Sequence, residues 1–283
     1  MQVNKSVIVN ESKEKIYEIG LEDAQVIEAA PKGIPIDYKD LNALIHEIVN
    51  LDYKKIILNN VCGQRFIGAA LRGDIELIIN GIPGNDLGIF MDGPSIMING
   101  NCEDQCGNTM NDGTVIVDGD CGDVVGLSSR GGKIFVKNNV GYRVGIHMKE
   151  YQNKYPLIII GGTTGDYLGE YMAGGKIIVL GFNILPDGTI LENQQPICGS
   201  NLGAGIHGGC IYLRTEENLD QKLGVGTKCS ELSVEEQKEV MSYVSDFCRI
   251  FSIPLNAIKD VPFKVIRPIS KRPFGNNYCS QLI

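Results

Sequence analysis

The chain has 283 residues, of which 43% are hydrophobic and 21% charged, and no stretch approaches the roughly 20 apolar residues that cross a bilayer. A chain of this length can bury a sizeable core without disulfides or structural metals. The net charge of -8 argues against a general surface for nucleic acids or anionic membranes. The N-terminal residues lack the pattern of a secretory signal, so we expect a cytoplasmic protein.

Residues 1–60 form an N-terminal segment with one expected helix. From Asp37 onward, apolar residues at positions 41, 44, 45, 48 and 49 follow helical spacing. Asp37 is a suitable N-cap, because its carboxylate can accept a backbone N–H of the first helical turn. The pattern predicts a helix over 38–50.

Residues 61–214 carry a repeat of about 19 residues. The chain contains 35 glycines, and the repeat aligns on seven of them, which we call the anchor glycines: Gly68, Gly88, Gly107, Gly126, Gly145, Gly169 and Gly203. The residue three positions after each anchor is large and apolar in six of the seven units, with methionine at Met91, Met110, Met148 and Met172. This column of residues is expected to be buried.

Most units continue with a glycine turn and a short alternating strand. Gly132, Gly175 and Gly209 belong to these turns, where glycine enters left-handed backbone regions freely. Alternating pairs such as Ile96 and Ile98 predict strands with one buried face. Two longer steps hold insertions at 149–155 and 182–195, which are expected to be surface excursions.

Stacking of these units is the way to a continuous core, because a single unit is too short to bury its apolar side. Such short units also leave no room for the crossover helices of a doubly wound sheet. The sequence therefore predicts a mainly β protein, a parallel β-helix of about seven Gly-rich coils with flanking N- and C-terminal helices. The usual handedness of parallel crossovers makes it right-handed.

Residues 215–283 form the C-terminal segment. Ser233 and Glu236 make a capping-box pattern, and apolar residues at 240, 244, 247 and 251 line one face of a helix over about 233–251. Both flanking helices are expected to cover the unpaired strand edges at the ends of the stack. The tail over 263–278 is expected to be extended. Its basic residues are candidates for docking a partner, with a plain solvated tail as the alternative: Arg267, Lys271 and Arg272.

The sequence predicts no catalytic and no cofactor-binding residue. Residues 203–208 spell a dinucleotide fingerprint, but they precede a strand and do not open a helix, so we attribute them to the repeat. His147 and His207 have no adjacent nucleophile or orienting carboxylate, which favours structural or surface roles. One polar column is attributed to turn chemistry, with calcium or polysaccharide binding as the alternative: Asn85, Asp104, Asp123 and Asp166.

No metal site is predicted from the cysteines. Their number is nine, which is odd, and no Cys-x-x-Cys spacing occurs, so free thiols are favoured. Four of them precede anchor glycines by five or six residues and are expected to share one column: Cys62, Cys102, Cys121 and Cys198. We interpret this column as reduced, buried and metal-free core packing, with a soft metal as the alternative. Cys106 does not change that interpretation.

The repeat resembles a known family. Its pattern G-x-x-x-G-x-x-M-x-G-G-x-I-x-V-x-G is nearly complete in residues 165–181 (GDYLGEYMAGGKIIVLG), and it resembles the GXGXG domain that ends the large (alpha) subunit of glutamate synthase. Residues 62–68 (CGQRFIG) resemble the first coil of that domain. Residues 141–145 (GYRVG) and 205–209 (GIHGG) resemble its free-standing form. The resemblance also implies a right-handed β-helix.

Glutamate synthase transfers the amide nitrogen of glutamine to 2-oxoglutarate in nitrogen assimilation, using a glutaminase domain, an FMN barrel and an iron–sulfur cluster. The cysteines of this chain have no cluster spacing. The resemblance therefore implies a non-catalytic scaffold subunit that needs no cofactor of its own. Its partners would be separately encoded glutaminase and FMN/iron–sulfur subunits of an oxidoreductase complex, and homo-oligomerisation is left open.

Three alternatives stay open at this point. Similar repeats occur in one of the subunits of formylmethanofuran dehydrogenase, which would make the chain a scaffold of a different enzyme. A carbohydrate-binding β-helix is a second alternative, although only 7% of the residues are aromatic and tryptophan is absent. A stand-alone structural repeat protein without an enzyme partner is the third.

Overall fold

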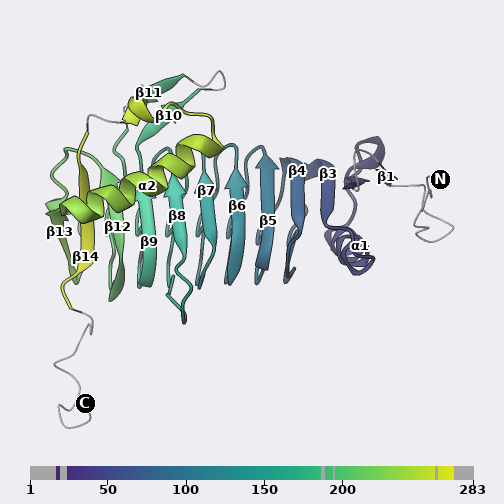
Figure 1. Cartoon of the computed structure of the whole chain (residues 1–283), viewed down its shortest axis with the longest axis horizontal. Helices are drawn as coiled ribbons and strands as arrows, with labels where there is room; N and C mark the ends of the chain where they lie inside the picture. Colours follow the sequence, from purple (N-terminus) through teal and green to yellow (C-terminus); the bar gives the residue numbers. More distant parts are fainter. Residues whose placement is uncertain (1–16, 20–23, 186–188, 194, 259–260, 271–283) are drawn as a thin grey trace, which may run out of the picture.

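The computed structural model describes residues 17–19, 24–185, 189–193, 195–258 and 261–270. Its parallel strands lie side by side in one row, and loops join each strand to the next (Figure 1). One 12-stranded sheet has the order β1-β2-β3-β4-β5-β6-β7-β8-β9-β12-β14-β13, and every neighbouring pair from β2 to β12 is parallel. The strands of this sheet are β1 (Tyr17–Ile19), β2 (Ala24–Glu28), β3 (Lys55–Cys62), β4 (Glu76–Ile82), β5 (Asp92–Asn99), β6 (Asp112–Val117), β7 (Lys133–Val136), β8 (Leu157–Ile160), β9 (Ala173–Val179), β12 (Gly208–Arg214), β13 (Thr227–Glu231) and β14 (Phe263–Pro268). The chain is a mainly β solenoid, as the sequence predicted.

The inner face of the sheet carries the apolar residues that the sequence assigned to it. Ile96 and Ile98 are fully buried, and so are their counterparts in the other coils: Leu77, Val115, Val117, Val136, Ile160, Ile177, Val179, Ile211 and Leu213. The column three residues after the anchors is buried as well: Leu71, Met91, Met110, Ser129, Met148, Met172 and Ile206. Both predictions are confirmed, because alternation along each strand and stacking between coils direct the same side chains inward.

About six turns follow one another directly, one fewer than the seven expected from the sequence. The last step, from β9 to β12, is interrupted by a hairpin of β10 (Phe182–Ile184) and β11 (Ile190–Glu192). This hairpin forms a separate 2-stranded sheet, so it does not add a coil to the stack.

Each anchor glycine lies at a corner of its coil, where the backbone has a positive φ that is strained for any other residue. Gly126 and Gly145 both have φ of +70°, in the left-handed region. A Cβ on Gly145 would lie 2.5 Å from Cδ1 of Ile177, so a strand isoleucine already fills that space. The residues two positions before and after an anchor glycine also have positive φ. Around Gly145 these are Arg143 (54°) and His147 (56°). The sequence did not indicate these positions, because side chains other than glycine mostly occupy them.

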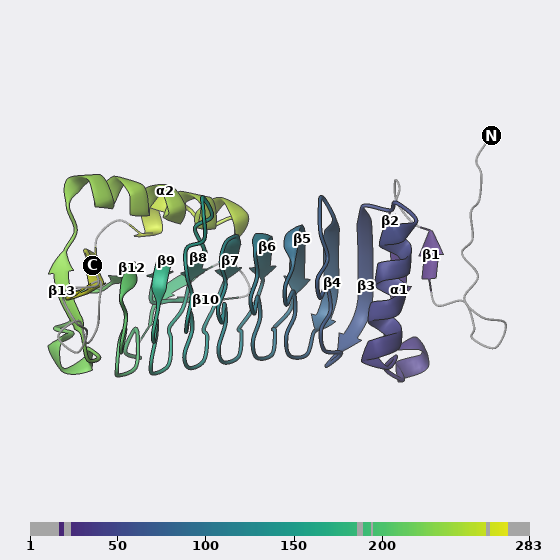
Figure 2. The ribbon, with the colours of Figure 1, turned by 90° about the horizontal axis from the view of Figure 1, so that it is seen from below.

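The helix α1 (Tyr38–Asn50) closes the N-terminal end of the solenoid (Figure 2). The Asp37 carboxylate accepts the backbone N–H of Lys39 at 2.9 Å, which confirms the predicted N-cap. Leu41, Ile45 and Ile48 are fully buried in the same core as the inner strand residues. The parallel sheet already starts at β2, within the N-terminal segment that the sequence set apart as residues 1–60.

The helix α2 (Val234–Ile250) begins at the predicted capping box, in which the backbone N–H of Glu236 donates to Ser233 Oγ at 3.2 Å. Its expected place at the end of the stack is wrong, because α2 runs along the outer face of β7, β8, β9 and β12 (Figures 1 and 2). Val240, Val244 and Phe247 are buried there, each contributing about 1.5–3 kcal/mol. The C-terminal strand edge is instead paired with β14 and then β13, both antiparallel.

The outer face of these strands explains the position of α2. One register row runs through the outward side chains Phe135, Ile159, Ile178 and Tyr212, which are all buried under the helix. Burying these four apolar side chains away from water is favourable and requires a packed element such as α2. The backbone groups at a strand edge can instead be hydrogen-bonded by another strand. The expected extended tail is confirmed for β14, and its continuation over 271–278 lies outside the described residues.

Candidate functional site

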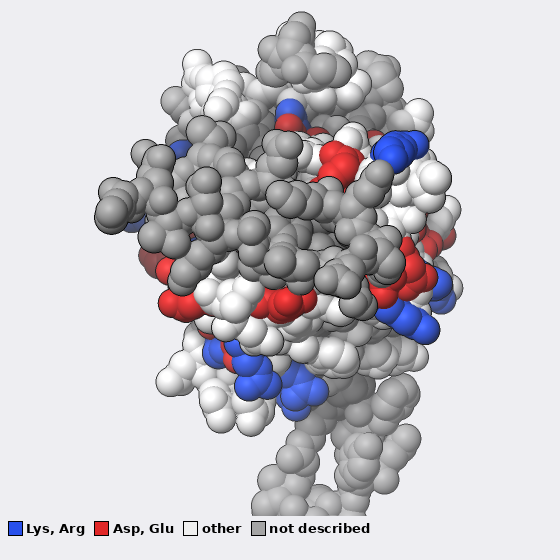
Figure 3. All heavy atoms as spheres, turned by 90° about the vertical axis from the view of Figure 1, so that its right-hand side faces the viewer, with Lys and Arg blue, Asp and Glu red and all other residues white. Residues whose placement is uncertain are grey.

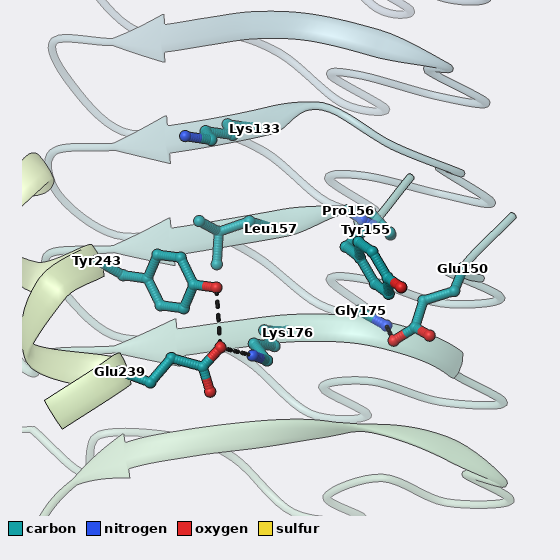
Figure 4. Close-up of a pocket in the computed structure, with 9 residues that line it drawn as sticks. All are labelled: Lys133, Glu150, Tyr155, Pro156, Leu157, Gly175, Lys176, Glu239 and Tyr243. Carbon is teal, nitrogen blue, oxygen red and sulfur yellow. Dashed lines mark hydrogen bonds and ion pairs between the residues drawn. The ribbon is translucent and has the colours of Figure 1, made fainter. Parts of the chain in front are cut away.

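A pocket of about 460 Å³ lies where α2 meets the outer face of the sheet (Figure 4). One register row supplies Lys133, Leu157 and Lys176 from β7, β8 and β9. The helix contributes Glu239 and Tyr243, which are one helical turn apart and point toward Lys176. The loop before β8 and the start of β9 complete the wall with Glu150, Tyr155, Pro156 and Gly175.

Three polar side chains of this pocket, Lys176, Glu239 and Tyr243, are paired with one another. One carboxylate oxygen of Glu239 accepts hydrogen bonds from Lys176 Nζ and, at 3.1 Å, from Tyr243 Oη. The bond from Lys176 lowers the pKa of Glu239. Burial is the largest single influence on Lys176 and works against its charged amine, but the hydrogen bonds and charges of Glu239 and Tyr243 together outweigh it and raise the pKa of Lys176. The pair stays ionised near neutral pH and fastens α2 to the sheet.

The sequence did not single out these pocket residues. The spacing of Glu239 and Tyr243 by one turn was visible, but Lys176 lies 63 residues before Glu239 in the chain. Only the docking of α2 on the sheet brings them together.

The structure places three thiols in contact inside the core. Cys102, Cys106 and Cys121 are 4%, 0% and 5% exposed, and their three Sγ atoms all lie within 4.8 Å of one another. Hydrogen bonds from Cys102 and Cys121 lower the pKa of Cys106. Cys106 is the member that sequence reasoning set aside. Its signal was present, since it immediately precedes the anchor Gly107 in a column that is otherwise aliphatic: Ile67, Leu87, Val125, Val144, Leu168 and Leu202.

The predicted cysteine column is partly correct. Cys102, Cys121 and Val140 are joined by parallel bridges between coils, and Cys198 is buried too. Cys62 is exposed, so its expected burial is wrong. It follows the buried Val61 at the end of β3, and alternation along the strand turns its thiol outward.

The acidic column makes hydrogen bonds between coils. The Asp104 carboxylate accepts the backbone N–H of Asp123, and Asp123 accepts that of Tyr142, both at 2.8 Å. Asp166 accepts the backbone N–H of Ser200 at 2.7 Å. These carboxylates therefore satisfy the backbone of the following coil, which supports the structural interpretation of the column.

The remaining candidates lie apart from the pocket and the thiols. His147 is stacked on Tyr171, with ring centroids 5.3 Å apart and an interplanar angle of 11°. His207 places Nδ1 3.2 Å from the carbonyl oxygen of Gly205. Arg267 forms an ion pair with Glu236 and donates to Ser230 Oγ at 2.8 Å. Lys271 and Arg272 lie outside the described residues.

Figure 3 shows how charged side chains are distributed on one end of the molecule. On this end, which carries α1, acidic and basic side chains are both present among the described residues (Figure 3). The described atoms of that face form no continuous basic patch. Neither helix in the described part of the chain is long and apolar enough to cross a membrane.

Comparison with known proteins agrees with the geometry. The chain is 49% identical over 252 residues to the uncharacterized protein MJ1350 of Methanocaldococcus jannaschii, covering 87% of this chain and 94% of that protein. The family model described as the GXGXG motif matches residues 36–260, from just before α1 to just before β14. The Gly-anchored coils and this match together show that the chain belongs to the GXGXG motif family.

Proposed function

We propose that the chain is a non-catalytic scaffold subunit of a glutamate synthase, holding separately encoded glutaminase and FMN/iron–sulfur subunits for the transfer of amide nitrogen from glutamine to 2-oxoglutarate. The observation that carries this proposal is the GXGXG family match over residues 36–260, joined to the resemblance of the repeat to the glutamate synthase domain.

A solenoid suits the role of a spacer. Each coil contacts mainly its neighbours. Successive strands add about 4.8 Å, so the nine parallel strands from β2 to β12 form a rod about 40 Å long. A rigid rod can hold two active sites at a fixed separation. This matters in amide transfer, because ammonia must pass between the sites without escaping to water.

We place docking on the outer face of β3, β4 and β5, which α2 leaves uncovered (Figure 1). The side chains of Ile57, Ile78 and Met97 are half-buried on this face. They belong to the same register row as Phe135, which α2 covers farther along the sheet. An apolar row that is continuous with a packed interface is a suitable surface for a partner element. Arg267 is a weaker docking candidate, because its guanidinium is already paired with Glu236.

Co-expression with the glutaminase and FMN/iron–sulfur subunits of the same organism tests the proposal. We expect a stoichiometric complex that buries more than about 1,000 Å². The isolated chain should be colourless and should not hydrolyse glutamine. Met97→Lys should abolish the complex while preserving the melting temperature, and Val225→Lys, at a residue that is 83% exposed, is the matched control.

Two outcomes would contradict the proposal. The first is flavin or glutaminase activity in the isolated chain. The second is a complex with subunits of a formyl dehydrogenase, or binding of polysaccharide, in place of the flavoprotein. The first outcome would remove the non-catalytic role, and the second would support the corresponding alternative.

A further inference from the structure

The convergence of Cys102, Cys106 and Cys121 is independent of the scaffold proposal. The structure describes five buried cysteines, and three of them meet at one point. Cys102 and Cys106 come from one coil, and Cys121 comes from the next coil. The backbones of Cys102 and Cys121 are paired in a parallel β-bridge. The neighbouring coils fill the same columns with aliphatic side chains, Val125 in place of Cys106 and Val140 in place of Cys121. Packing alone therefore does not require sulfur at these places.

The surroundings restrict what three thiols could bind. All three side chains belong to the apolar core. Among the described residues, no further cysteine, histidine or carboxylate joins this group as a possible metal ligand. Zinc sites are almost always four-coordinate, and this site offers three sulfur ligands. Thiolates in proteins commonly select Cu(I), zinc or iron–sulfur clusters. Iron–sulfur clusters take four cysteines, as zinc sites do, whereas Cu(I) accepts three sulfur ligands.

We propose that Cys102, Cys106 and Cys121 form a three-sulfur binding site for Cu(I). Binding forms Cu–S bonds and releases one thiol proton to solvent for each thiolate formed. The ion stays Cu(I) throughout, so no oxidant or reductant takes part. Entry is through the side of Cys102 and Cys121, which keep 4% and 5% of their surface exposed while Cys106 is sealed.

The test is an anaerobic titration of the reduced full chain with Cu(I), in competition with a Cu(I)-specific chelator. We expect one Cu(I) per chain to be retained, with sulfur-to-copper charge-transfer absorption and a melting temperature raised by about 5 °C or more at a hundredfold excess over Kd. Release of protons on binding is measured in weak buffer.

Variants separate this site from other thiols. Cys106→Val and Cys121→Val copy the residues of the adjacent coil, so they should fold, and circular dichroism verifies this. Each should lower Cu(I) affinity at least tenfold and remove the thermal shift. Cys198→Val, at a buried thiol of the same column, and Cys62→Ser, at an exposed thiol, should bind as the parent does.

The proposal is overturned if Cys106→Val retains Cu(I) as tightly as the parent, because other thiols would then be responsible. It is also overturned if the folded parent fails to hold one Cu(I) against the chelator, or if Zn²⁺ binds these three thiols more tightly than Cu(I). In each of these cases the cluster is core packing or a different site.

Discussion

Replacing Gly145 with alanine should destabilise the solenoid by more than backbone strain alone. The glycine has φ of +70°, and an added Cβ would lie 2.5 Å from Cδ1 and 3.4 Å from Cγ1 of Ile177. The left-handed conformation costs a non-glycine residue about 1–2 kcal/mol. Crowding of a packed core side chain adds about 1–3 kcal/mol. We expect Gly145→Ala to lower the free energy of unfolding by about 2–5 kcal/mol.

Two further variants separate strain from crowding. Gly73 has φ of +83° and nothing within 4 Å of an added Cβ, so Gly73→Ala should cost only the strain, about 1–2 kcal/mol. Ile177→Val removes the Cδ1 atom and alone costs about 0.5–1.5 kcal/mol. Combined with Gly145→Ala, it should cost less than the sum of the two single changes, by about 1 kcal/mol.

Urea unfolding followed by circular dichroism measures these differences, with the slope against urea checked for each variant. Equal destabilisation by Gly145→Ala and Gly73→Ala would refute the crowding argument. Additivity of Gly145→Ala and Ile177→Val would refute the specific contact with the isoleucine.

Three other changes follow from the structure. Met172→Asp places a carboxylate at a fully buried position and should cost several kcal/mol, seen as loss of the folded protein in thermal melts. Asp123→Ala removes the acceptor for an exposed backbone N–H of the next coil and should lower the unfolding free energy by about 0.5–1.5 kcal/mol in urea titrations. The hydrogen bond from Arg267 lowers the pKa of Glu236 in the folded protein below its ordinary value of 4.5. The stability that the ionised carboxylate contributes is therefore fully present above pH 4.5 and is lost as the pH falls through the pKa of the folded state. Glu236→Gln should therefore flatten the acid loss of stability below pH 4.5, whereas Glu235→Gln, at an exposed neighbour, should leave it unchanged.

Local pattern alone determined much of the architecture. Glycine spacing and strand alternation predicted the inward columns, including the buried Met172, because both depend on residues close in sequence. The caps at Asp37 and Ser233 were predicted for the same reason, since a cap is a contact within one helical turn. The repeat by itself also indicated the GXGXG family.

Only the tertiary structure decided which surfaces meet. The position of α2 depends on the outward row at Phe135 and its neighbours, and the pairing of that row with a helix about 100 residues later in the chain is a contact between distant segments. The convergence of Cys106 with Cys121 depends on the left-handed corners, which set the direction of side chains from adjacent coils. The pairing of Arg267 with Glu236 required β14 to lie beside β13, next to the start of α2. A sequence pattern reports which side of its own element a residue faces, whereas contacts between elements depend on how coils stack and how helices dock.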